Sequence, residues 1–333
     1  MASSGLGSQF GAKKESAWGT AVTVDTFFEY SSESLSRENE YYEPETLRAG
    51  RTFQPSGTTR QTGRNVAGDT SLPFPTKKGG FFLDQMVAGT ITPVQVASTI
   101  AYNSTFNIGA SVPTKSATLQ INKPTTQGVD TPFTYPGARL QSAAFSMEVG
   151  GGLQSTFNWV AKDETNPTTT PAGAALASAT YVSGTSTWAH SDVTLTLNAT
   201  PAAAITSLNW TWEQPRAIRR FLGSGGTIAD PVPNGLATVA GTFSGEWYDE
   251  TYYDLFCSGA FAALVVTFTH PVAIVGTEYP TFTNTFSAIQ LRGSSPQVSG
   301  PEMLAVDIPW VARDDGTNPP WQAIYKSSDS AAW

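Results

Sequence analysis

The chain of 333 residues contains few of the residues on which disulfide bonding, metal binding and phosphate binding depend. It has one cysteine, Cys257, and two histidines, His190 and His270, so neither a disulfide within one chain nor a cysteine-rich metal site is available. Charged residues make up 14% of the chain and the formal net charge is -8. An acidic chain of this kind lacks the basic surface with which proteins grip DNA phosphates.

Long apolar runs are also missing. The longest, Ala260 to Phe268, is far shorter than the ~20 residues that a membrane-spanning helix needs. The N-terminus is polar and rich in Gly and Ser, without the basic and apolar regions of a signal peptide. We therefore expect a protein that is soluble or part of an assembly and that has no membrane partner.

Threonine, serine, glycine, valine and aromatic residues are abundant, which is typical of short strands joined by turns. Polar and apolar residues alternate in the segments around Trp210 and Trp247, as they do in strands with one buried face. The composition and this alternation predict a mainly β fold.

The aromatic residues change to helical spacing around Phe81 and again around Tyr252. This change predicts one short flanking helix in each half of the chain. The expected caps are Thr76 and Asp249 at the N-termini and Gly89 and Gly259 at the C-termini.

The sequence contains an internal repeat. The segment WVAKD at 159–163 recurs as WVARD at 310–314, and VAG at 66–68 recurs at 239–241. Such a match predicts two tandem copies of one unit. We expect an N-terminal arm at 1–17, a first domain at 18–170, a linker at 171–190 and a second domain at 191–333. The first copy carries extra length, which we place within 91–131.

No pattern typical of catalysis stands out. The glycine runs at 150–152 and 223–226 lack the lysine and the strand-turn-helix setting of nucleotide-binding loops. The acidic pair Asp314-Asp315 is followed, after one inserted glycine, by Thr-Asn-Pro, and a similar pair at 163–164 is followed directly by the same three residues. This recurrence favours a repeated turn over a metal site. We expect no enzymatic activity, no cofactor and no metal.

Several segments resemble the tail tube proteins, also called major tail proteins, of long-tailed phages of the siphophage type. They are FGAKKESAWGTA at 10–21, LRAGR at 47–51 and the WVAKD segment at 159–163. The resemblance implies β-sandwich or half-barrel domains, each with one short helix, whose sheets join between subunits into a ring-shaped barrel. It also implies rings, usually six-fold, that stack into a hollow tube.

Two domains per chain would let three chains close a ring with pseudo-six-fold symmetry, and we expect this arrangement. The alternative is a ring of six chains in which the second domain of each chain lies outside the tube. The resemblance further implies a virion protein, assembled in the bacterial host cytoplasm, that conducts DNA during ejection. Its expected partners are itself, the tail tip, terminator and tape-measure proteins, and genomic DNA that passes without specific binding.

The polar faces of the predicted strands are the candidate lining of the DNA channel. Their carboxylates would repel the DNA backbone and leave a hydrated gap, because like charges act over the Debye length of about 8 Å. The candidate residues are Ser34, Ser36, Glu38, Glu40, Asp69, Ser71, Ser207, Asn209, Thr211, Glu213, Thr242, Ser244 and Glu246.

One alternative from another class remains open at this point. A β-sandwich adhesion or carbohydrate-binding module, decorating a virion or cell surface, would present exposed tryptophans that stack on sugars. The candidates are Trp18, Trp188, Trp321 and Trp333. A hydrolase is less favoured, because no histidine, carboxylate and nucleophile are grouped in the sequence.

Overall fold

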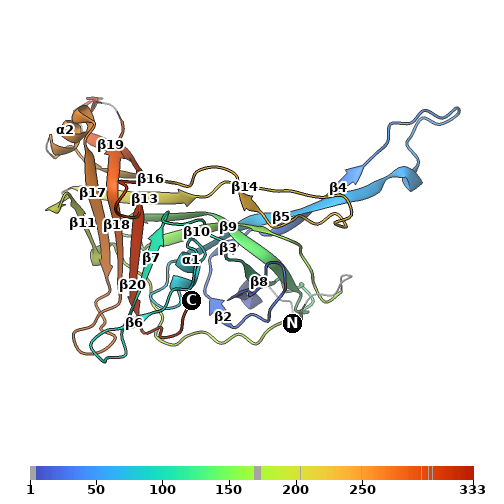
Figure 1. The fold of residues 1–333 in the computed structure, drawn as a ribbon, viewed down its shortest axis with the longest axis horizontal. Helices are drawn as coiled ribbons and strands as arrows, with labels where there is room; N and C mark the ends of the chain where they lie inside the picture. Colours follow the sequence, from blue (N-terminus) through green and yellow to red (C-terminus); the bar gives the residue numbers. More distant parts are fainter. Residues whose placement is uncertain are drawn as a thin grey trace.

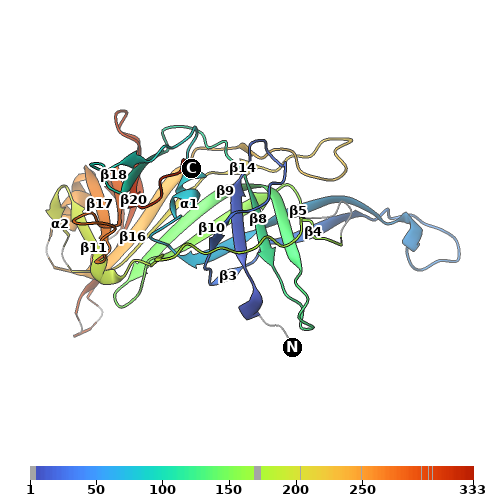
Figure 2. The same ribbon diagram turned by 90° about the horizontal axis from the view of Figure 1, so that it is seen from below.

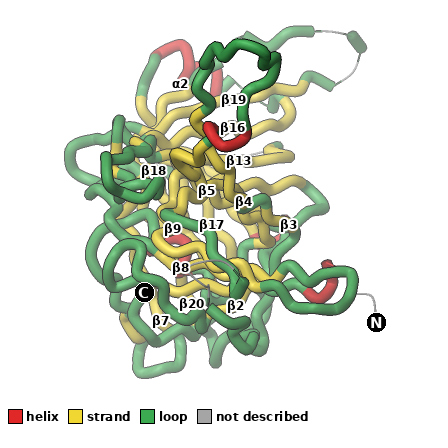
Figure 3. Tube along the Cα trace, turned by 90° about the vertical axis from the view of Figure 1, so that its right-hand side faces the viewer, coloured by secondary structure: helices red, strands yellow, loops and turns green. Residues whose placement is uncertain are grey.

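The computed structural model describes residues 5–168, 174–202, 204–248, 250–293, 295–298, 300–301 and 303–333. Strands far outnumber helices in it, so the prediction of a mainly β protein is confirmed. Figure 3 shows the helices as short red segments among strands and loops.

The centre of the molecule is one antiparallel sheet, which we call the central sheet (Figures 1 and 2). Each strand of it is paired with the next. In spatial order its strands are β4 (Ser36–Tyr42), β5 (Arg60–Pro73), β10 (Gln154–Ala161), β9 (Pro132–Glu148), β13 (Ile205–Glu213), β16 (Thr238–Glu246) and β19 (Ala305–Ala312). The short strand β3 (Ser32–Glu33) precedes β4 on the same edge of β5.

Further strands extend both ends of the central sheet. The first half of β9 pairs with β8 (Ala117–Asn122), which continues to β1 (Phe10–Lys14) and β2 (Thr26–Phe28). Part of the predicted N-terminal arm is therefore a strand, and Phe10 within it is fully buried.

At the other end β19 pairs with β18 (Thr281–Leu291), which is flanked by two groups of strands. One group is β17 (Phe261–Thr269), β11 (Val193–Leu197) and β12 (Thr200–Pro201). The other is β20 (Trp321–Ser327), β7 (Tyr102–Ile108) and β6 (Val94–Gln95). β7 lies within 91–131 and pairs with β20, a strand of the second half. A separate pair is formed by β14 (Arg216–Ala217) and β15 (Val232–Pro233).

Each half of the chain contains one short α-helix, as the spacing predicted: α1 (Gly80–Asp84) and α2 (Thr251–Ser258). Gly259 ends α2 in the left-handed conformation with φ of 64°, so the predicted cap is confirmed. The predicted caps of α1 are wrong, because its N-cap is Gly79 and its C-cap is Gln85. The hydroxyl of Thr76 instead accepts the backbone N–H of Ser186 (3.0 Å). Asp249 lies outside the described residues.

The core lies on one face of the central sheet. Alternate residues point into it, among them Trp159, Trp210 and Trp310, whose side chains are fully or almost fully buried. Phe145 on β9 stacks on Trp210 on β13, with ring centroids 5.0 Å apart and planes within 12°. The core therefore continues without a break across the pairing of β9 with β13.

The two halves share details of strand register. Trp159 lies opposite Gly68 in the first half, and Trp310 lies opposite Gly241 in the second. The next pairing repeats as well, since Leu140 faces Trp159 and Leu291 faces Trp310.

A β-bulge also recurs, between residues 117 and 119 of β8 and between residues 262 and 264 of β17. The strand that precedes the repeated VAG segment pairs with it in a different register in the two halves. In the sequence match, Ser34 corresponds to Ser207 and Asp69 to Thr242. Ser34 contacts Asp69, but Asn209 and not Ser207 faces Thr242, so the register differs by two residues. A shift of two residues keeps every side chain on its face of the sheet.

Between the halves, residues 174–188, which include most of the predicted linker, run without a strand along the first half. The side chain of Gln120 holds this segment by bonds to the backbone of Ala175 (3.1 Å) and Ala177 (2.9 Å). The ring of Tyr181 contacts Phe27.

Candidate functional site

All the candidate residues predicted from the sequence lie on one face of the central sheet, which we call the polar face. Directly opposed residues in antiparallel strands point to the same side. The register links the candidates across the sheet: Ser71 faces Thr156, Ser142 faces Glu213, and Thr242 faces Asn209. The polar face thus runs unbroken from β4 to β19.

Short hydrogen bonds order this face in the first half. The hydroxyl of Ser34 accepts the backbone N–H of Asp69 (2.9 Å), and the amide of Asn158 donates to the carboxylate of Asp69 (2.7 Å). The hydroxyls of Ser71 and Thr156 are 2.9 Å apart. Asn209 in the second half repeats the role of Ser34, because its side-chain oxygen accepts the N–H of Thr242 (3.2 Å).

The polar face also includes residues that the sequence argument missed. They lie on the strands between the two groups of candidates: Gln154, Thr156 and Asn158 on β10, Ser142, Ser146 and Glu148 on β9, and Asp307 on β19. The signal for them was present, since polar residues alternate with Phe and Trp in QSTFNW at 154–159.

Exposed charge on the polar face is mostly negative. Its carboxylates are Glu38, Glu40, Asp69, Glu148, Glu213, Glu246 and Asp307. The register also places two arginines on this side: Arg139 on β9 is buried and paired with Asp230, and Arg60 stands at the far end of β5. We expected these carboxylates to have no ion-pair partner, but Glu40 has one. The guanidinium of Arg220, in the loop after β13, forms an ion pair with Glu40 (2.9 Å). Glu213 and Glu246 are exposed.

The described residues include both histidines and the one cysteine of the chain. They contain no group of three or more His, Cys, Asp or Glu side chains placed to hold a metal ion. The ring of His270 approaches the hydroxyl of Ser186 (3.1 Å), a contact between a strand end and the linker.

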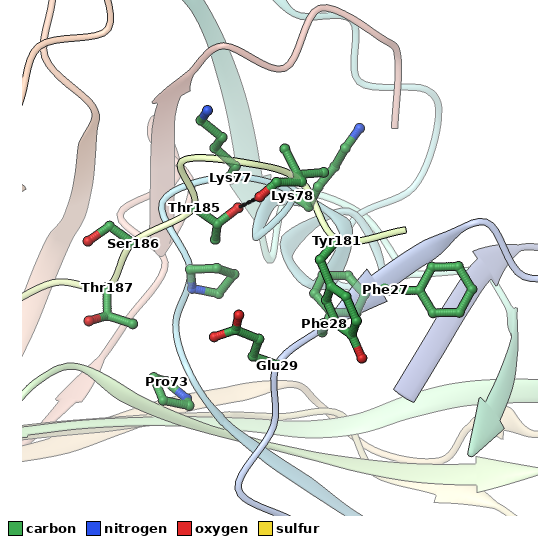
Figure 4. A pocket seen from close by; sticks show the side chains of 12 residues that line it. Phe27, Phe28, Glu29, Pro73, Lys77, Lys78, Tyr181, Thr185, Ser186 and Thr187 are labelled. Atoms are coloured by element: carbon green, nitrogen blue, oxygen red, sulfur yellow. Dashed lines mark hydrogen bonds between the residues drawn. The ribbon is translucent and has the colours of Figure 1, made fainter. Parts of the chain in front are cut away.

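One small pocket of about 70 Å³ lies beneath the linker (Figure 4). Phe28, Glu29 and Tyr181 line it, and the side chains of Lys77 and Lys78 extend away from Glu29. Because the linker segment forms one wall, the pocket is a gap in the packing of the linker rather than a built ligand site.

The tryptophans that an adhesion module would expose are largely occupied. Trp188 and Trp321 are fully buried. The indole N–H of Trp18 donates to the carbonyl of Gly137 (3.1 Å), and that of Trp333 donates to the hydroxyl of Ser104 (2.9 Å). These positions argue against a sugar-stacking surface.

In the part of the chain that the structure describes, no helix has the length and apolarity to cross a membrane. No curated protein matches the chain. The family model described as "Phage tail tube protein" matches residues 5–312, which includes the central sheet and both helices. The chain is thus a non-enzymatic structural protein of the virion tail, and it belongs to the phage tail tube protein family.

Proposed function

We propose that three chains form each ring of the tube, with two tube units in every chain, and that the polar face lines the DNA channel. The first unit corresponds to residues 18–170 and the second to 191–333. This proposal refines the family function, which is to build the tail tube by self-assembly.

The observation that carries the proposal is the pairing of β9 with β13, which we call the seam. Seven consecutive residue pairs, from Ser207 with Glu148 to Glu213 with Ser142, join the two units edge to edge. The repeated registers of Trp159 and Trp310 support a common origin for the units. Neighbouring units of a ring would therefore be joined in the same way whether they belong to one chain or to two.

The free edges of the chain fit such a ring. β13 pairs with β9 on one edge and with β16 on the other, whereas β4, its counterpart, pairs only with β5 among the described strands. An unpaired strand edge is a site for pairing with another chain. We assign the partner of the β4 edge to the β18–β19 end of the next chain, so that seams within and between chains alternate around the ring.

Electrostatics supports the assignment of the polar face to the channel. The opposite face of the central sheet is buried in the core. Around the β9–β13 pairing the polar face presents the exposed carboxylates Glu148, Glu213 and Glu246, and its nearest arginine, Arg139, is buried and paired with Asp230. Lysine or arginine contacts would release counterions and hold the duplex. An acidic, hydroxyl-rich wall instead lets DNA move through a layer of water and ions.

Electron microscopy of tubes assembled from the purified chain tests the ring. We expect three chains per ring and pseudo-six-fold class averages, because each chain supplies two similar units. Rings with one chain per six-fold position would contradict the proposal, since the second unit would then lie outside the inner barrel.

Charge reversal tests the channel wall. Glu213→Lys and Glu246→Lys should leave tubes assembled but slow DNA ejection, because each ring would gain lysines facing the DNA. Asp254→Lys is the matched control, an exposed carboxylate of α2 away from the polar face. Normal ejection by both polar-face variants, or equal slowing by the control, would contradict the assignment.

The tube also has to meet the tail tip, terminator and tape-measure proteins. The two ends of a stacked ring and its inner wall are the surfaces that would contact them. Complexes of tubes with each candidate, isolated by cosedimentation, would test these contacts.

A further inference from the structure

The loop after the first strand of each unit has a different environment in the two units. In the second unit it spans 214–237 and packs against the first unit. In the first unit it spans 43–59 and projects away from the rest of the chain, as Figures 1 and 2 show. We call 43–59 the tip and 214–237 the docked loop.

The docked loop is anchored on the first unit by buried arginines. The guanidinium of Arg216 is buried and donates to the carbonyls of Leu140 (3.0 Å) and Pro113 (3.3 Å). Burial, together with the nearby positive charge of Arg139, lowers the pKa of Arg216 to about 10, which shows that placing a charge at this site is costly. The loop therefore holds this position through specific contacts.

Two further contacts extend the anchor along the first unit. The carboxylate of Asp230 pairs with both the Nε (2.5 Å) and an Nη (2.7 Å) of Arg139, which is nearly buried. Farther on, Arg220 reaches Glu40 and the carbonyl of Arg64 (2.9 Å). The docked loop thus crosses the seam and lies along the neighbouring unit.

Within the described part of the chain, the tip has no such support from the rest of the monomer. Its hydrogen bonds are internal, such as that from Gln54 to the carbonyl of Pro44 (2.9 Å). Leu47 is fully exposed, and Phe53 is 87% exposed. Two large apolar side chains at the end of a long projection are typical of a surface that another molecule covers.

The second unit carries an uncovered surface at the positions that hold the docked loop on the first. Val160 and Val311 are equivalent in the repeated WVA segments. Arg139 lies opposite Val160, and Gln290 lies opposite Val311. Gln290 and Leu291 therefore correspond to Arg139 and Leu140. Phe261 on the neighbouring strand β17, which pairs with Gln290, is 57% exposed.

Two cations lie on the strand ends at this surface. Arg292 and Arg313 are exposed and form no ion pair within the described residues. The tip begins with exposed carboxylates, Glu43 and Glu45, that also lack an ion pair there. Opposite charges thus stand on the two surfaces, as Asp230 and Arg139 do in the docked pair.

We propose that the tip docks on the second unit of the neighbouring chain in the same ring, at the surface around Gln290, as the docked loop does on the first unit of its own chain. This inference rests on the proposed three-chain ring. The molecule that covers the tip is thus a second copy of this chain. Leu47 and Phe53 make the apolar part of the contact, and Glu43 and Glu45 face Arg292 and Arg313.

Cross-linking in assembled tubes tests the position. In a Cys257→Ser background, Thr46→Cys with Gln290→Cys and a short bismaleimide should give covalent dimers and trimers on denaturing gels, and no larger species. Thr46→Cys with Thr194→Cys, on the strand β11, is the control and should give none. A ladder that continues beyond three chains would place the tip on the next ring and overturn the inference.

Microscopy of the same tubes separates this inference from the proposed function. Three-chain rings without the cross-link would overturn the docking alone, whereas rings of six chains would overturn the ring on which it rests.

Substitution of the tip tests its necessity. Leu47→Asp and Phe53→Asp should lower the yield of tubes at least tenfold and leave the thermal unfolding of the monomer unchanged, because neither side chain packs in the monomer. Leu222→Asp, a fully exposed leucine of the docked loop, should change the yield less than twofold. Equal yields from tip variants and wild type would overturn the inference.

Discussion

Replacing the two matched tryptophans Trp159 and Trp310 with phenylalanine should have unequal effects on stability. Both are almost fully buried and lie opposite Gly68 and Gly241 at matching register positions. The indole N–H of Trp159 donates to the hydroxyl of Thr70 (3.0 Å). The N–H of Trp310 has no hydrogen-bond partner among the described residues.

The expected difference follows from these N–H groups. Both substitutions remove a similar volume, so the packing losses largely cancel in the comparison. Trp159→Phe also loses a hydrogen bond worth about 0.5–1.5 kcal/mol net. Trp310→Phe instead removes a buried donor whose unpaired state costs about 1–3 kcal/mol. The two effects add, so Trp159→Phe should be the more destabilising by about 1.5–4.5 kcal/mol.

Denaturant and thermal unfolding of the monomer, followed by tryptophan fluorescence and circular dichroism, would measure the difference. Thr70→Val provides a control, because it removes the acceptor of Trp159 and should reduce the gap between the two tryptophan variants. The reasoning is refuted if Trp310→Phe is as destabilising as Trp159→Phe or more so.

Two further stability predictions follow. Asp84 and Lys115 are both buried and form an ion pair, so Asp84→Asn, which leaves the buried ammonium without its carboxylate, should cost about 3–5 kcal/mol. The double change Asp84→Leu with Lys115→Met should recover most of this loss, and equal losses of the single and double variants in denaturant unfolding would contradict the prediction. Gly241→Ala should cost about 1–3 kcal/mol, because its new methyl group would meet the carbonyl of Asn209, whereas Gly57→Ala, with open space around it, should be neutral in the same assay.

Local alternation predicted which residues share the polar face. Ser207 to Glu213 and Thr242 to Glu246 alternate with large apolar residues, and a period of two fixes the side of a strand on which each residue lies. The prediction was insensitive to the two-residue shift between Ser34 and Asn209, since an even shift preserves the face.

Pairings between distant segments could not be read from the sequence in the same way. The pairing of β9 with β13 and that of β7 with β20 join residues far apart in the chain, and no local pattern specifies which edges meet. The N-terminus of α1 was misplaced for a similar reason. Thr76 has the chemistry of a cap, but Ser186 of the distant linker takes its hydroxyl.

The ion pair of Glu40 with Arg220 also depends on a nonlocal contact. The sequence places Glu40 among alternating polar residues, and its exposure and acidity follow from that. Its neutralisation depends on the docked loop returning across the seam, which only the assembled fold determines. The acidic character of the polar face is thus stronger near Glu213 than near Glu40.

A tandem chain changes the energetics of ring closure. In a ring of three two-unit chains, half of the seams form within a chain, where the effective concentration of the second edge is about millimolar for a short connection. The Asp230–Arg139 pair and the buried Arg216 then stabilise those seams before any two chains meet. Only the remaining seams depend on chain concentration. Weakening the docked loop, for example by Asp230→Ala, should therefore lower monomer stability first and tube yield second, whereas changes in the tip should affect tube yield alone.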